Sequence, residues 1–298
     1  MTTALALLPD FALILLGFGL RRAMHLGDHF WAGLEKLVYF VLFPALLFNA
    51  LVRTAIDWQA AAPLAATGAL AMGVAMVLGG AARWLFPQSP ISFASQFQCA
   101  FRFNSYIGLA VAGNLHGAAG IAAMGLLTGA MVPLANVAAV WMLARHGSAG
   151  VWRELAKNPL ILATLAGLLW NLAGWPVPTP ALKFLGRLSE ASITLGLLAV
   201  GSALKLRGAF GGGGYGAALW LSAVKLLAMP AATLLLARGF GLTGVYFDVA
   251  LAFAALPTAT SAYILTQRMG GDGPRVAWII SATTLAAMVT LPAWLGSL

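Results

Sequence analysis

The sequence is poor in charge and nearly free of cysteine. Only 8% of its 298 residues are Asp, Glu, Lys or Arg, whereas a soluble domain carries about 25%. A water-soluble globule, a disordered chain, a coiled coil and a nucleic-acid-binding surface all need more charge, and we expect none of these. The one cysteine, Cys99, excludes an intrachain disulfide and a metal site made from several cysteines.

Recognisable catalytic motifs are also missing. The sequence has no His-Glu-x-x-His motif, no Gly-x-Ser-x-Gly motif and no pair of acids within an apolar run. We therefore predict that the protein is not an enzyme, and that it has no catalytic residues, no cofactor and no bound metal.

Hydrophobic residues make up 61% of the chain and form long continuous runs. A membrane-spanning helix needs roughly 20 apolar residues. Continuous runs favour helices, because strands of a membrane barrel alternate apolar and polar residues. We predict an all-α polytopic membrane protein with ten spans. They lie at about 4–20, 33–53, 60–86, 93–115, 118–144, 158–174, 182–204, 215–237, 246–268 and 275–296.

The 17 Lys and Arg residues predict the orientation of these spans. With the N-terminus outside, inner loops hold ten of them and outer loops four, and cytoplasmic loops are normally the more basic. Arg21 and Arg22 follow the first apolar run, so we interpret that run as a retained span rather than a signal peptide. We predict a multi-pass inner-membrane protein with both termini outside the cytoplasm.

The longest polar connection, 145–157, separates five spans from five. Because five is odd, two similar halves would have opposite orientations, as in the inverted repeats of secondary transporters. We predict a first five-helix repeat at 1–146, a cytosolic linker at 147–157 and a second repeat at 158–298.

Weak internal similarity supports two halves. Offsets of 151 to 155 residues align Asn104 with Pro257, and Gly117 with Gly270. In transporters of this plan the substrate site lies near the middle of the membrane, in interrupted helices. We therefore expect the site at mid-depth in both halves.

Three spans carry unusual residues at that depth. Arg102 and Lys225 lie about ten residues into the fourth and eighth spans, about 15 Å along a helix and half of a ~30 Å core. Pro257 lies at similar depth in the ninth span and removes a helical hydrogen bond. A midplane cation costs about 2.5–3.5 kcal/mol and usually faces a cavity or a partner. No acid lies clearly beside these cations, which favours an anionic substrate; pairing with carbonyls and a simple proline kink are the alternatives.

Neighbouring polar residues complete the predicted site. In the fourth span, spacings of three and four place on one helical face Ser95, Gln98, Cys99, Arg102 and Tyr106. Asn104 and the glycines after it make the second half of this span a poor helix, which could be unwound. The predicted substrate-binding residues are Arg102, Asn104, Ser105, Tyr106, Lys225, Pro257, Thr258, Thr260 and Ser261.

Asp10 and Asp248 lie near the ends of their spans and are not assigned to the site. Two further charged residues are candidates in other spans: Lys36 at the start of the second span and Glu190 within the seventh. For Lys36 the alternative is an interfacial pair with Glu35, and for Glu190 a helical pair with Arg187.

Four segments carry a further pattern. They are GLEKLVYFVLFPALLF at 33–48, NPLILATLAGLLW at 158–170, LSEASITLGLLAVG at 188–201 and AALPTATSAYILTQ at 254–267. In this order they resemble the second, sixth, seventh and ninth helices of the auxin efflux carrier family. That family joins plant auxin carriers with bacterial organic-acid permeases. Lys36 and Pro44 match the basic residue and proline of its second helix, and Glu190 stands where an Asp is usual.

The resemblance implies a fold of ten helices in two inverted five-helix repeats. Helices 1, 2, 6 and 7 would form a scaffold that often dimerises, which makes Lys36 and Glu190 scaffold-side candidates. Helices 3 to 5 and 8 to 10 would form a moving transport domain. Helices 4 and 9 would be broken and would cross at the substrate site, which includes Asn104 and the segment from Pro257 to Ser261.

We accordingly expect a secondary active transporter of a small organic anion that works by alternating access. The substrate would be a carboxylate, either auxin-like or a dicarboxylate. The expected partners are this anion, the lipid bilayer and a second copy of the chain, and no nucleic acid. The alternative is a membrane channel or a substrate sensor without coupled flux.

The charge bias predicts a labelling pattern. A cysteine placed at position 298 should react with a membrane-impermeant thiol reagent in intact cells, because the C-terminus is expected outside. A cysteine placed at position 150, within the predicted linker, should react only after the cells are opened. Labelling at 150 but not at 298 in intact cells, measured as a mass shift of the protein, would contradict the orientation.

Overall fold

The protein is all-helical wherever its structure is described. The structure is a computed structural model that describes residues 2–24, 26–53, 58–144, 159–204 and 215–296, and every regular element in these ranges is a helix. Within these ranges, six helical segments are long and apolar enough to cross a membrane. These observations confirm an all-α membrane protein. The predicted linker at 147–157 and the first residue of the predicted second repeat, Asn158, lie outside the described residues.

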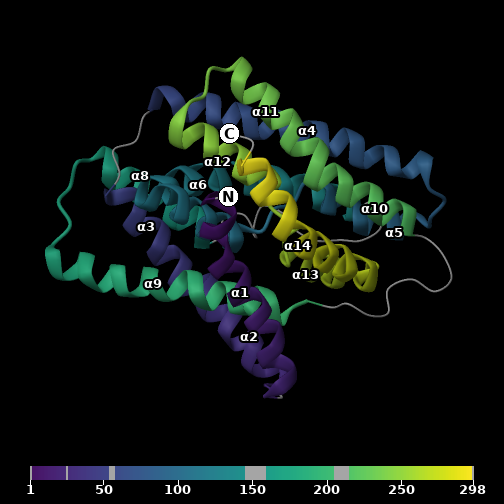
Figure 1. Ribbon diagram of the computed structural model, residues 1–298, viewed down its shortest axis with the longest axis horizontal. Helices are drawn as coiled ribbons and strands as arrows, with labels where there is room; N and C mark the ends of the chain where they lie inside the picture. The colour runs from purple at the N-terminus through teal and green to yellow at the C-terminus, as the bar shows by residue number, and fades with distance from the viewer. Residues whose placement is uncertain (1, 25, 54–57, 145–158, 205–214, 297–298) are drawn as a thin grey trace.

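The helices follow the predicted apolar runs in order (Figure 1). Their bounds are α1 Thr2–Ala23, α2 Asp28–Leu37, η1 Val38–Leu42, α3 Phe43–Arg53, α4 Trp58–Leu85, α5 Pro90–Phe97, η2 Gln98–Ala100, α6 Ser105–Ala144, α8 Pro159–Leu172, α9 Thr179–Ser202, α10 Tyr215–Ala223, η3 Val224–Ala228, α11 Met229–Gly239, α12 Gly244–Ala255, α13 Ser261–Arg268 and α14 Gly273–Gly296.

Two runs contain a π-helical turn just before an internal proline. Pro44 and Pro230 each follow a wider π-helical turn, η1 and η3. A proline lacks the N–H of a normal helical hydrogen bond, and its ring meets the carbonyl one turn earlier. The extra residue of a π turn accommodates both effects. The second and eighth runs are therefore continuous rods.

The fourth and ninth runs, by contrast, are interrupted. The helix of the fourth run ends at Ala100 and restarts at Ser105, and that of the ninth ends at Ala255 and restarts at Ser261. The continuous helical face expected from Ser95 to Tyr106 is therefore wrong, because the chain leaves the helix between them. The expected unwinding of the second half of this run is also wrong, since α6 begins directly after Asn104.

Each interrupted run ends in a tight turn at a glycine. Helix α6 kinks at His116 and Gly117, where the φ of Gly117 is +55°. Between α13 and α14 the φ of Gly270 is +68°. A side chain is strained at such angles and glycine is not. The two glycines aligned by the internal offset thus both have a positive φ.

Close helix crossings depend on glycine. Helix α1 packs across α9, and α3 packs along α8. A Cβ on Gly201 of α9 would lie 1.8 Å from the backbone oxygen of Ile14, and one on Gly17 of α1 would lie 2.1 Å from that of Leu198. The two backbones therefore touch directly, as small residues allow in membrane bundles.

The crossing of α1 and α9 gives a stability prediction. Gly201→Ala should lower the midpoint of thermal unfolding in detergent, because overpacking of this kind costs about 1–3 kcal/mol. The control is Gly186→Ala on the same helix, where an added Cβ meets nothing within 4 Å. That change should be neutral or stabilising, since Ala favours a helix over Gly by about 1 kcal/mol. Equal midpoints for the two variants would contradict the close crossing.

Candidate functional site

The two interruptions meet each other inside the protein. The backbone N–H of Asn104 donates to the carbonyl of Pro257 at 3.0 Å. The Thr258 hydroxyl donates to the carbonyl of Cys99 at 2.9 Å, and its backbone N–H donates to the Thr283 hydroxyl at 3.2 Å. All five residues are buried or internal to the bundle. The broken segments therefore cross, with α14 behind them.

Local sequence explains where each helix stops. Leu256 has extended backbone angles, φ −61° and ψ 145°, as expected for a residue that precedes proline. On the other segment, the side-chain oxygen of Asn104 accepts the backbone N–H groups of Tyr106 at 3.1 Å and Ile107 at 3.3 Å. This is an N-cap, which satisfies the first free donors of a helix. Pro257 thus follows one helix end, and Asn104 starts another.

The crossing holds a buried donor that is not used. The side-chain nitrogen of Asn104 has no hydrogen-bond partner among the described residues, and Asn104 is only 1% exposed. An unsatisfied buried donor costs about 1–3 kcal/mol. Helices α6 and α13 both begin at this crossing, and helix N-termini carry partial positive charge. The arrangement is suited to a negatively charged group.

The described hydrogen bonds of the two cations expected at mid-depth, Arg102 and Lys225, go to neutral groups. The Lys225 ammonium is fully buried and donates to the carbonyl of Ala254 at 2.6 Å, with the Met229 sulfur at 3.5 Å. Ala254 lies in the last turn of α12, where helix carbonyls are otherwise free. The Arg102 guanidinium donates to side-chain oxygens of Gln98 on η2 at 2.9 Å and Asn136 on α6 at 2.7 Å. Both charges therefore lie close to the interruptions.

The other predicted site residues divide into two groups. Ser105, Tyr106, Thr260 and Ser261 are partly or fully exposed at the starts of α6 and α13. The Tyr106 ring lies against that of Phe43 on α3, with centroids 4.5 Å apart. Two others, Lys36 on α2 and Glu190 on α9, are exposed, and no described contact joins them to the crossing. The residues of the crossing include no group of three or more His, Cys, Asp or Glu that could hold a metal, nor does the rest of the described chain.

Polar contacts at one end of the broken helices were not predicted. The Asn114 side chain on α6 donates to the Asp10 carboxylate on α1 at 2.7 Å, and His116 is bonded to Asp248 of α12 at 2.7 Å. Asp10 is the ninth residue of α1 and is 8% exposed, so its expected place near a span end is wrong. An acid within an apolar run was the signal that could have identified it.

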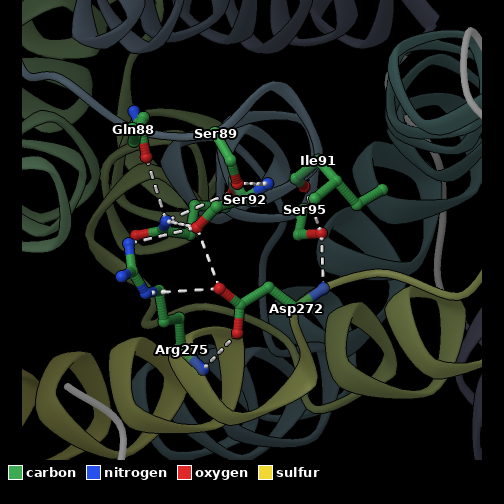
Figure 2. A network of polar contacts seen from close by, with 8 residues as sticks. Gln88, Ser89, Ile91, Ser92, Ser95, Asp272 and Arg275 are labelled. Carbon is green, nitrogen blue, oxygen red and sulfur yellow. Dashed lines mark hydrogen bonds and ion pairs between the residues drawn. The ribbon is translucent and has the colours of Figure 1, made fainter. Parts of the chain in front are cut away.

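A second polar network lies where α5 meets the turn between α13 and α14, at the opposite end of the two interrupted runs (Figure 2). The Ser92 hydroxyl of α5 donates to the Asp272 carboxylate at 2.9 Å, and Arg275 of α14 pairs with the same carboxylate at 3.2 Å. The Asp272 backbone N–H donates to the Ser95 hydroxyl at 2.8 Å. The spacing of Asp272 and Arg275 at a helix start was the available signal. This network joins α5 to the turn between α13 and α14.

The Thr258 contact predicts a stability difference between two buried threonines. Thr258→Val should lower the thermal unfolding midpoint, because it removes the hydroxyl that holds the Cys99 carbonyl of the other broken segment; a net hydrogen bond is worth about 0.5–1.5 kcal/mol. Thr233→Val is the matched control, since the Thr233 hydroxyl bonds only within its own helix, to Met229. A smaller loss for Thr258→Val than for Thr233→Val would contradict the role of this contact.

Comparison with known proteins places the chain among membrane transporters. Residues 142–295, just over half of the chain, match the family model described as "Membrane transport protein". The chain is 26% identical to a "Putative malonate transporter" of Rhizobium meliloti (strain 1021), over 95% of this chain and 92% of that protein. It is also 26% identical to an "Uncharacterized transporter" of Methanothermobacter thermautotrophicus, over 95% of this chain and 94% of that protein.

A plant relative matches over a shorter segment. The chain is 32% identical to "Auxin efflux carrier component 3a" of Oryza sativa subsp. japonica over 121 residues, which is 39% of this chain and 20% of the plant protein. The family resemblance predicted from the second, sixth, seventh and ninth spans is thereby confirmed. This multi-pass membrane protein belongs to the membrane transport protein family, the family of the auxin efflux carriers.

Proposed function

We propose that the protein is a secondary carrier that moves a small organic anion across the membrane by alternating access. The observation that carries this proposal is the crossing of two broken helices around the unused amide donor of Asn104. Broken helices near the membrane midplane are the usual substrate sites of secondary transporters. Two helix N-termini and a free donor at one point favour an anion over a cation.

An inverted repeat of five and five helices accounts for the packing. If the first half repeats in the second, the first and second spans correspond to the sixth and seventh. The contact of α1 with α9 then corresponds to the contact of α8 with α3, and both contacts are present. The paired interruptions and the positive φ angles of Gly117 and Gly270 support the same relation.

Two bodies would move against each other. One, the scaffold, comprises α1, α2 with η1 and α3, α8 and α9; the other, the transport body, comprises α4 to α6 and α10 to α14. A cavity of about 270 Å³ lies at their boundary, between α4, α6 and α8, and its lining is almost entirely apolar. Thr164 is the one polar side chain in this lining, so few polar contacts hold the two bodies together at this place, which supports movement there.

The substrate we propose is a carboxylate. A carboxylate can accept hydrogen bonds from the Asn104 amide and from Ser105, Tyr106, Thr260 and Ser261 at the helix starts. Thr258 and Pro257 shape the crossing, and the Arg102 and Lys225 charges add positive potential. A relative is named for malonate, which is a dicarboxylate, and another for auxin, which is a monocarboxylate. Lys36 and Glu190 stay scaffold-side candidates.

The membrane orientation and the dimer that we propose rest on the distribution of basic residues and on the family resemblance. The carrier would lie in the inner membrane with both termini outside the cytoplasm, and two copies would associate through the scaffold helices. In this arrangement the transport bodies of a dimer remain free to move.

The unused donor gives the test of the proposal. Asn104→Ser should weaken binding and transport of the substrate by about ten- to a hundredfold, because a hydrogen bond to a charged group is worth about 1.5–3 kcal/mol. Serine is also a good N-cap, so α6 should keep its start and the protein its unfolding midpoint. The measurement is saturable counterflow of malonate or indole-3-acetate in proteoliposomes, with binding measured separately in detergent.

Three outcomes would count against the proposal. Unchanged transport by Asn104→Ser would remove Asn104 from the site. Binding by the parent protein without counterflow would indicate a sensor, and flux without saturation would indicate a channel.

A further inference from the structure

The hydrogen bond between Asp10 and Asn114 joins the two proposed bodies. Asp10 lies in α1, on the scaffold side, and Asn114 lies in α6, on the transport side. Their side chains are bonded at 2.7 Å, and Asp10 is 8% exposed. An ionisable side chain within a membrane helix is costly and marks a functional site more often than not.

Asp10 has no cationic partner within the described residues. The described ion pairs are Arg21 with Asp28, His116 with Asp248 and Arg275 with Asp272, and none includes Asp10. Helix α1 packs against α6, α9 and α14. The titratable or charged residues on these helices are Arg21 and Arg22 on α1, Tyr106 and His116 on α6, Lys183, Arg187 and Glu190 on α9, and Arg275 on α14.

Each of these groups either is bonded to another residue or lies away from Asp10 along its helix. His116 is bonded to Asp248, and Arg275 to Asp272. The charged residues of α9 lie in its first half, whereas α1 crosses α9 at Gly201, in its last turn. Among the described residues the recorded partner of Asp10 is therefore the neutral Asn114 amide, and the smallest mobile ion that can neutralise the carboxylate is a proton.

An asparagine is a suitable partner for a carboxyl group that gains and loses a proton. Its amide donates through nitrogen to the carboxylate, and after a 180° flip it accepts through oxygen from the carboxylic acid. The pair can thus keep one hydrogen bond in both protonation states, and the bond to the charged carboxylate is the stronger of the two. If the transport body moves, however, Asp10 loses the donor that stabilises its charge, and the neutral acid is then favoured.

One helical segment connects this pair to the crossing. The part of α6 before the kink begins at Ser105, directly after Asn104, and ends beyond Asn114. Asn104 and Asn114 are ten residues apart, or about 15 Å along a helix. A displacement of the segment by substrate at its start is therefore transmitted to the Asp10 contact at its end.

We propose that Asp10 is a proton-binding site that couples protonation to the separation of α1 from α6, so that a proton gradient drives the carrier. The proposal rests on the proposed function. The Asp10 carboxylate takes a proton from water as the Asn114 contact opens, and it returns the proton when the contact forms again. Because coupling is reciprocal, protonation favours the open contact to the same extent that opening favours protonation.

The experiment uses the full chain in proteoliposomes with malonate as the probe. In the parent, a gradient of about one pH unit should change malonate accumulation by up to about tenfold, since one pH unit is about 1.36 kcal/mol per proton. Asp10→Asn keeps the hydrogen bond to Asn114 but carries no titratable group. It should abolish the response to the pH gradient while malonate counterflow at equal pH on both sides continues.

Asp28→Asn is the control, because the Asp28 side chain is 89% exposed at the start of α2; it should respond to the gradient like the parent. A gradient response that survives Asp10→Asn overturns the inference, and so does accumulation driven by sodium at equal pH and lost in Asp10→Asn. Loss of counterflow together with a lower unfolding midpoint assigns Asp10 to structure and also overturns it. Absence of saturable flux in the parent is a different result, because it refutes the proposed function itself.

Discussion

Main-chain groups freed by a broken helix inside a membrane must find partners within the protein, because hydrocarbon offers none. This constraint accounts for the crossing. The interruption after Ala100 leaves the Asn104 N–H free, and the interruption after Ala255 leaves the Pro257 carbonyl free. The Asn104 N–H supplies the donor that the Pro257 carbonyl needs, and the carbonyl supplies the acceptor. Each interruption therefore depends on the other. The site depends on this mutual requirement.

The same requirement extends to the ends of the broken helices. One network joins α5 to the turn before α14, and the His116 contact joins α6 to α12. Lys225 holds the last turn of α12 from η3, a helix that is itself continuous through Pro230. The interrupted segments are thus fixed to each other at both ends and in the middle. Movement of one without the other would cost several buried hydrogen bonds at once.

Much of the fold can be predicted from the sequence because hydrophobic runs of this length have few alternatives. Pro257 and Arg102 also mark the two segments that contain the interruptions, since proline and charge are both expensive within a membrane helix. The resemblance implies a break near Asn104, but the residues alone do not give its position, because Phe101 and Phe103 are as compatible with a helix as their neighbours. The Asn104 cap and the contact with Pro257, 153 residues away along the chain, fix it in the folded protein. The burial of Asp10 could not be predicted for a related reason: its partner, Asn114, belongs to another helix.

The single cysteine lies at the crossing itself. Cys99 is fully buried, and its carbonyl is held by Thr258. A thiol in this position is shielded from water-borne reagents as long as the two broken segments stay together. The natural chain therefore serves as a chemically silent background for cysteines introduced elsewhere, and any reactivity of Cys99 would report the opening of the crossing.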